Sequence, residues 1–222
     1  MSNGRKKDGV AFKIPSVEAM APPPVNYSFG RYGPGPVVPS EEECLAICKA
    51  FDMPAHILRH SQTVARVASC LASRAVQAGL DVDEQAVRAS ALLHDLAKGY
   101  TIQYGGHHSQ LGGAWVQDLT HNPQIAQGVI HHVYWPFEVD PRRYFLPLAV
   151  GYADKRVRHD VIVTLTERFE DLFVRYGATG DIRARIQGTL DQARILEKKL
   201  SEALEVDLHA CAFDCGGLVG GA

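Results

Sequence analysis

The chain has 222 residues, with 23 Lys and Arg residues against 25 Asp and Glu residues, which gives a formal net charge of −2. A balance this close to neutral argues against a dedicated nucleic-acid binder, so no specific nucleic-acid partner is expected. No run of 18 apolar residues is present, and the five cysteines are too few and too scattered for a disulfide scaffold, so we expect no membrane partner and a cytoplasmic location.

Residues 1–39 are predicted to form an irregular N-terminal arm. They hold seven of the twelve prolines, and neither a helical nor an alternating apolar period survives among them. The arm also carries large apolar side chains, so it either packs on the domain or remains a loose tail: Phe12, Ile14, Tyr27, Phe29 and Tyr32.

Helix signals begin at Ser40, which the three glutamates of residues 41–43 follow, so an N-cap and a capping box are predicted there. Pro54 suits the first turn of a second helix that runs to about residue 78, with Gly79 as the C′ glycine. A third helix is expected to begin within residues 81–84 and to stop near Gly99.

The rest of the chain also has a helical pattern, and no convincing run of alternating strand residues is present. Together these patterns predict an all-α fold, with one helical domain over residues 40–206 and a tail over residues 207–222. The last helix carries a heptad-like apolar stripe that either caps the bundle or pairs with a second chain in a homodimer. In the tail, His209, Cys211 and Cys215 form only a weak metal-binding pattern. The five further helices are expected over residues 107–119, 122–133, 145–158, 162–176 and 181–204.

Histidines are the unusual feature of the composition, because six of the ten lie between His94 and His132. On one helix, His94, Asp95 and Lys98 would share a face with Val87 and Ala91, where a core is expected. Burying a carboxylate or a lysine is costly unless it has a partner or a metal ion. Three ionisable groups on one core face therefore favour a functional site.

The same pattern recurs on other predicted helices. His60 continues the apolar stripe of its helix, and His108 opens a helix. Asp154 lies between Val150 and Val157 on the apolar face of its helix. For the adjacent pair of residues 131–132, helical phase favours His132, although His131 is kept as a candidate. Imidazole and carboxylate are the ligands that divalent Fe, Mn, Zn, Co or Ni accept in a helical bundle. The alternative is a helical domain whose histidines are only structural.

The order His60, His94-Asp95, Asp154 resembles the H…HD…D signature of the HD-domain metal-dependent phosphohydrolase superfamily. The additional histidines resemble those of the subset that holds two metals. The pattern His108-x3-Gly112 with the later His132 is similar to bacterial HD-type symmetrical dinucleoside-tetraphosphate hydrolases.

This resemblance implies an HD-domain helical bundle with a site for two divalent transition-metal ions. Iron is the favoured metal, and manganese, cobalt, nickel and zinc are the alternatives. Asp95 would bridge the two metals, and Lys98, also placed in the catalytic machinery, would contact a phosphate oxygen. The first metal would be held by His60, His94, Asp95 and Asp154, and the second by Asp95, His108 and one or both of His131 and His132.

The implied activity is hydrolysis of a nucleotide or another small phosphate ester or anhydride by metal-activated water. Arg156, in the basic cluster of residues 155–158, is a candidate for binding the anionic substrate, and Arg142 and Arg143 lie upstream of it. Two alternatives use the same ligand set: an HD-type mixed-valent di-iron oxygenase and a non-catalytic regulatory HD domain.

Overall fold

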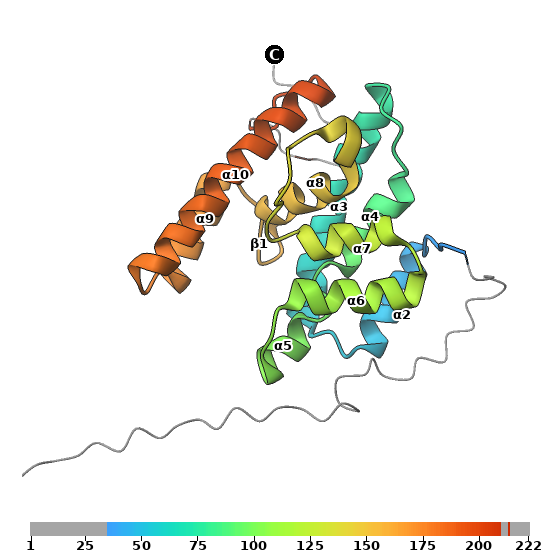
Figure 1. Ribbon diagram of the computed structural model, residues 1–222, viewed down its shortest axis with the longest axis horizontal. Helices are drawn as coiled ribbons and strands as arrows, with labels where there is room; N and C mark the ends of the chain where they lie inside the picture. Colours follow the sequence, from blue (N-terminus) through green and yellow to red (C-terminus); the bar gives the residue numbers. More distant parts are fainter. Residues whose placement is uncertain (1–34, 210–212, 214–222) are drawn as a thin grey trace, which may run out of the picture.

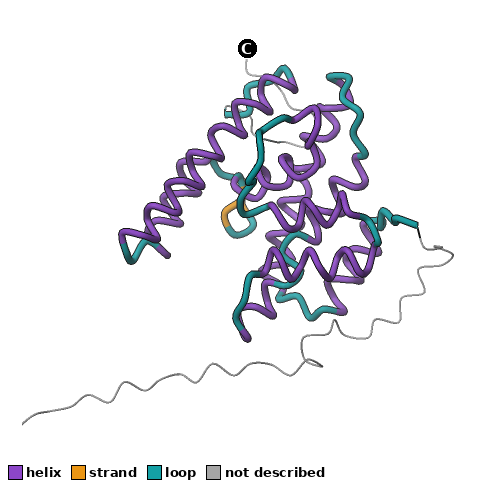
Figure 2. Tube along the Cα trace, in the orientation of Figure 1, coloured by secondary structure: helices purple, strands orange, loops and turns teal. Residues whose placement is uncertain are grey.

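The computed structural model describes residues 35–209 and 213, and within them nearly all regular structure is helical (Figures 1 and 2). This confirms the prediction of an all-α fold. In chain order the elements are α2 (Glu41–Ala50), α3 (Ala55–Gln77), α4 (Glu84–Leu93), α5 (Lys98–Tyr104), α6 (His108–Thr120), α7 (Pro123–His131), α8 (Pro141–Lys155), β1 (Val157–Arg158), β2 (Val161–Ile162), α9 (Leu165–Tyr176) and α10 (Gly180–Leu204).

The first helix ends follow the predicted capping chemistry. Ser40 and Glu43 form both hydrogen bonds of a capping box at the start of α2. Pro54 is the N-cap of α3, and the C-cap of α3 is Ala78, which makes Gly79 the C′ residue. Gly79 has a φ of +79°, a left-handed conformation that glycine adopts without steric cost.

The prediction of one helix from residues 81–84 to Gly99 is wrong, because α4 ends at Leu93 and α5 begins at Lys98. In the turn between them, the amides of Leu96 and Lys98 bond to carbonyls three residues back instead of four. His94 Nδ1 lies 2.7 Å from the carbonyl oxygen of Ala91, which would otherwise accept from the amide of residue 95 in a continuous helix. The side chain therefore competes with the helical backbone at this point.

Two further differences lie around α8. This helix begins at Pro141, where Asp140 caps it and proline suits its first position, but its backbone is kinked at Tyr144, so the part after the kink starts at the predicted residue 145. It ends at Lys155, and the next residues form the short antiparallel hairpin of β1 and β2, which has no counterpart among the predicted elements. Strands of two residues are too short to show an alternating pattern, so the sequence carries no signal for them.

Helix α3 lies at the centre of the bundle and packs against α4 and α8, while α7 packs against α4, α6 and α8. Figure 1 shows α9 and α10 side by side, extending away from the other helices. The apolar stripe of α10 is buried only from Leu190 onward, as capping of the bundle requires, whereas Ile182 near its start is 37% exposed. The buried members of the stripe are Leu190, Ala193, Leu196, Leu200 and Leu204.

Only residues 35–39 of the predicted arm are described. They form neither helix nor strand, and they lie on the domain: the amide of Val37 donates to the carbonyl of Thr120, and Asn122 Nδ2 donates to the carbonyl of Val37. Cys211 and Cys215, singled out in the tail, lie outside the described residues.

Candidate metal centre

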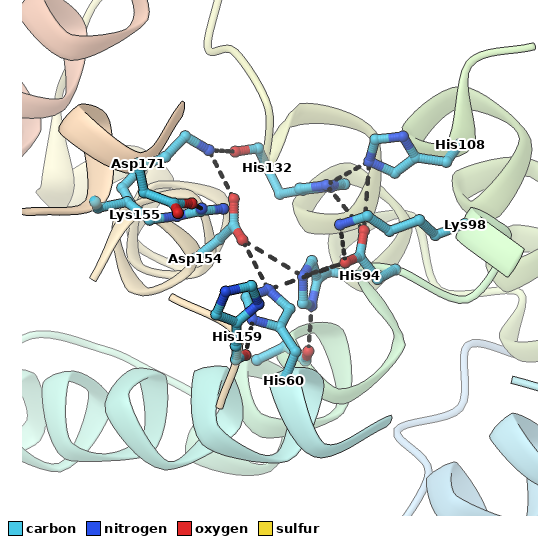
Figure 3. Close-up of polar contacts among 12 residues, drawn as sticks. His60, His94, Lys98, His108, His132, Asp154, Lys155, His159 and Asp171 are labelled. Carbon is cyan, nitrogen blue, oxygen red and sulfur yellow. Dashed lines mark hydrogen bonds and ion pairs between the residues drawn. The ribbon is translucent and has the colours of Figure 1, made fainter. Parts of the chain in front are cut away.

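Six ionisable side chains from five segments of the chain meet at one point inside the bundle (Figure 3). They come from α3, from the turn after α4, from the start of α6, from the residue after α7 and from the end of α8. All of these residues were candidate ligands in the sequence: His60, His94, Asp95, His108, His132 and Asp154.

Three of the histidines are oriented by backbone carbonyls. The Nδ1 atoms of His60, His94 and His132 each lie 2.7 Å from a carbonyl oxygen, those of His159, Ala91 and Val129 respectively. A ring that donates through Nδ1–H carries its lone pair on Nε2, which is the tautomer that binds a metal ion. In all three rings Nε2 faces the carboxylates of the cluster.

Asp95 stands between the two halves of the cluster. Its Oδ2 lies 3.4 Å from His94 Nε2 and 3.9 Å from His60 Nε2. Its Oδ1 lies 3.4 Å from His108 Nε2 and 3.6 Å from His132 Nε2. We call His60, His94, Asp95 and Asp154 the first group and Asp95, His108 and His132 the second group.

Asp154 completes the first group, because its Oδ1 lies 3.0 Å from His60 Nε2 and 3.8 Å from His94 Nε2. Burial by itself raises the pKa of this carboxyl, but Lys155 and His60 hold it well below its usual range. In the same way, burial opposes and His94 and Lys98 favour the ionised form of Asp95, and its pKa also lies well below the usual range. Both carboxyls are therefore anionic at neutral pH.

The histidines respond to burial differently. Burial lowers the pKa of His132 to about 3, with a further lowering from His94, and burial also lowers the pKa of His108. Burial acts in the same direction on His94, but Asp95 and Asp154 outweigh it and raise its pKa. Both rings of the second group are therefore neutral at pH 7 and able to bind a metal ion without losing a proton.

Within the part of the chain that the structure describes, two buried atoms at the centre of the cluster have no hydrogen-bond partner: His94 Nε2 and Asp95 Oδ1. Such atoms are rare in folded proteins, because an unsatisfied buried polar group costs free energy. In addition, the Nε2 atoms of His108 and His132 lie only 3.1 Å apart, although His132 already uses Nδ1 as its donor. Lone pairs that converge on anionic oxygens without donors fit a bound cation, so the residues present fit a pair of divalent metal ions.

Lys98 donates to Asp95 Oδ2 at 2.6 Å, and its side chain is 36% exposed. His108 is the other partly open member, at 28%, whereas His60, His94 and His132 are nearly covered. The cluster is therefore open to solvent on the side of Lys98 and His108.

The structure separates the two adjacent histidines. His132 is buried in the cluster, whereas His131 packs its ring against Trp135 and Phe137 and belongs to neither group. The helical phase of α7 had favoured His132, which is the one of the two that lies in the cluster.

Arg156, the candidate for binding an anionic substrate, is not at the surface, because its side chain is only 3% exposed. Its guanidinium donates to the carbonyls of Val163 and Leu208 and to the hydroxyl of Tyr152. It therefore links α8 to the segment before α9 and to the chain beyond α10. The basic cluster of residues 155–158 had predicted exposed side chains. The end of α8 packs against α10, and Arg156 is buried there.

Sequence reasoning missed two features of the site. The carbonyl of His159, at the tip of the β1–β2 hairpin, orients His60, and His159 has a left-handed φ of +58°. Lys155, expected at the surface, is buried and donates to Asp154 Oδ2 and to the carbonyl of His132. Backbone carbonyls leave no mark in a sequence, and a lysine next to an aspartate at a helix end is typical of a solvated surface.

Among the described residues, no helix is long and apolar enough to cross a membrane. Comparison with solved structures gave no match. Among curated proteins, the chain is 26% identical to Ribonuclease Y of Clostridium perfringens (strain 13 / Type A) over 172 residues, which cover 68% of this chain and 32% of that protein. It is 24% identical to Ribonuclease Y of Opitutus terrae over 180 residues (72% and 33%) and 29% identical to Ribonuclease Y of Treponema pallidum over 119 residues (53% and 23%).

The chain thus spans at most about a third of the length of these relatives. A model of the HD domain matches residues 57–169, just over half of the chain, and this range contains every residue of both groups. The chain belongs to the HD domain family, as the order of its histidines and aspartates had indicated.

Proposed function

We propose that the chain is a metal-dependent phosphohydrolase whose first and second groups each hold one divalent transition-metal ion. The observation that carries the proposal is the pair of buried atoms without partners, His94 Nε2 and Asp95 Oδ1, at the point where the two groups meet. Membership of the HD domain family supports the same chemistry. The soft-to-borderline imidazoles favour iron, manganese, cobalt, nickel or zinc over calcium or magnesium.

The chemistry that divalent metals supply at such a site is polarisation of a phosphoryl oxygen and a lowered pKa of a bound water. Asp95 would be shared between the two groups, so its two oxygens, which already face opposite sides, would set their separation. Lys98 lies at the open side and would hold a phosphate oxygen as a point charge while its ammonium stays paired with Asp95.

The substrate is proposed to be a nucleotide or another small phosphate ester or anhydride. A second candidate is the phosphodiester of RNA, which the similarity to Ribonuclease Y favours although the net charge of −2 does not. Both candidates are hydrolytic, and the same relatives favour hydrolysis over the oxygenase alternative.

A panel assay tests the proposal. The full chain, loaded with Mn²⁺ or anaerobically with Fe²⁺, is offered a dinucleoside tetraphosphate, nucleoside mono- and triphosphates, a generic phosphate ester and end-labelled single-stranded RNA. We expect metal-dependent release of phosphate or of shorter products from one class, equally in air and without oxygen for the Mn²⁺ form. Activity that survives chelation, or that needs oxygen, would contradict the proposal.

A further inference from the structure

We propose that Lys155 is a positioning residue that fixes the first and second groups relative to each other, an inference that rests on the metal-dependent function proposed above. In the sequence Lys155 lies in a basic cluster that suits contact with an anionic substrate. In the structure its side chain is only 8% exposed, so the ammonium is not available to a ligand at the surface.

The ammonium joins one member of each group (Figure 3). Lys155 Nζ donates to Asp154 Oδ2 at 2.8 Å and to the carbonyl oxygen of His132 at 2.8 Å. The other oxygen of Asp154 faces His60 at 3.0 Å, and the ring of His132 faces Asp95 at 3.6 Å. A single side chain therefore lies behind a ligand of the first group and behind a ligand of the second.

Each of these two contacts adds a restraint to a group next to the cluster. The terminal torsion of an aspartate is broad, so the bond to Oδ2, together with the contact between Oδ1 and His60 Nε2, holds Oδ1 toward the histidines. His132 is the C-cap of α7, and the last carbonyls of a helix have no partner within it. Outer partners of this kind orient metal ligands, and their loss typically lowers metal affinity about 10- to 100-fold.

Removing the ammonium has two effects of opposite sign on metal binding. Loss of a positive charge next to the cluster would by itself strengthen the binding of a cation. Loss of the two hydrogen bonds would free Asp154 and His132 and weaken it. The direction of the change in affinity therefore decides whether Lys155 acts mainly through its position or mainly through its charge.

The experiment is a Mn²⁺ titration of Lys155→Met in the full chain, with free Mn²⁺ followed by electron paramagnetic resonance. The matched control is Lys199→Met, which removes a half-exposed lysine of α10 whose ammonium lies 3.7 Å from Glu202 Oε2. We expect Lys155→Met to bind Mn²⁺ about 10- to 100-fold more weakly, with activity restored when Mn²⁺ is raised in proportion and with a KM near that of the wild type. The control should match the wild type.

Three results would overturn the proposal. Tighter or unchanged Mn²⁺ affinity would show that the two hydrogen bonds do not position the ligands. A raised KM at saturating Mn²⁺, with unchanged Mn²⁺ affinity, would return Lys155 to substrate binding. If the wild-type chain binds no Mn²⁺, the proposed function fails and this inference fails with it, whereas normal binding by both wild type and variant removes only the inference.

Should Lys155→Met fail to fold, Lys155→Gln carries the same test. Its amide can still donate to the His132 carbonyl but is too short to reach both oxygens, so weakened Mn²⁺ binding with wild-type helix content by circular dichroism is again expected. Wild-type affinity in Lys155→Gln would contradict the proposal.

Discussion

At the scale of single residues, the adjacent histidines 131 and 132 provide a matched pair. His132 is buried with Nε2 toward Asp95, while His131 packs on aromatic rings outside both groups. Identical substitutions at neighbouring positions therefore separate a candidate ligand from a structural ring.

His132→Asn is expected to abolish binding in the second group and to lower hydrolysis at least about 100-fold, because asparagine cannot present an imidazole nitrogen to the metal. His131→Asn should keep both metals and most of the activity. Elemental analysis of the two purified variants, with turnover on the same substrate, makes the comparison. Equal metal loss in both variants, or metal loss only in His131→Asn, would contradict the assignment of His132 as the ligand of the second group.

Proton competition at His94 predicts a pH dependence of metal binding. Its pKa in the metal-free chain is raised above 6.5, so the ring is protonated at pH 6.5 and below and must lose that proton when a metal binds. Affinity in the first group should therefore still be rising with pH at 6.5, by up to tenfold per unit, and should level off once the pH passes the raised pKa.

The second group should show no such rise near neutrality. The pKa of His132 is lowered to about 3 and that of His108 is also lowered, so both rings are already neutral there. Calorimetric titration in buffers of different ionisation enthalpy counts the protons released. Binding with no proton released in the first step at pH 6.5 would contradict the assignment of His94.

At the scale of elements, α7 carries His132 to the cluster and packs closely against α4 at Gly128. A Cβ built at Gly128 would overlap Ser90 Oγ and come within 2.7 Å of Leu146 Cδ2, and Ser90 itself donates to the carbonyl of Ile125. Close packing at this glycine therefore limits the distance between α4 and α7, whose C-caps are His94 and His132.

Gly128→Ala is expected to cost about 1–3 kcal/mol of unfolding free energy, because the added methyl group forces α7 away from α4. Metal affinity of the second group should fall as well. Gly188→Ala in α10 is the control: nothing lies within 4 Å of its built Cβ, so the alanine should stabilise the chain by about 0.5–1 kcal/mol. Urea unfolding of both variants measures the difference, and an unaffected Gly128→Ala would contradict this packing argument.

Arg156 acts across elements rather than at the site. It donates to the carbonyls of Val163 and Leu208 and lies 3.5 Å from Glu197, so it connects α8 with the segment before α9, with α10 and with the chain beyond α10. We expect Arg156→Met to lose about 1–3 kcal/mol of stability, because the carbonyls of Val163 and Leu208 lose this donor.

The KM of Arg156→Met should stay near that of the wild type under conditions where the variant is folded. Arg185→Met, at an exposed position of α10, should change neither quantity. Thermal unfolding and steady-state kinetics on the same preparations decide the point. A raised KM without a loss of stability would restore the interpretation of Arg156 as a substrate-binding residue.

At the scale of the whole molecule, the sequence predicted what depends on periodicity and on residue chemistry. Capping at Ser40, the end of α3 at Gly79 and the inward face of α10 follow from local rules, and the structure has all three. The six residues that meet in the cluster were recognisable because ionisable groups on apolar faces need partners. Their convergence from five segments also agrees with membership of the HD domain family.

What the sequence could not predict depends on contacts between distant segments. At the break after Leu93 the ring of His94 is bonded to the Ala91 carbonyl, and the orientation of His60 depends on a carbonyl 99 residues away. Whether Lys155 and Arg156 are exposed depends on how α10 and the hairpin cover the end of α8. No pattern within a single helix contains that information.

The most direct test of the account is the anomalous scattering of a crystal of the metal-loaded chain, recorded at the absorption edge of the bound metal. Two peaks are predicted, one within about 2.0–2.3 Å of ligand atoms of His60, His94, Asp95 and Asp154 and the other equally close to Asp95, His108 and His132. A loaded crystal with no peak among these residues, or with peaks only elsewhere, would contradict the proposed function.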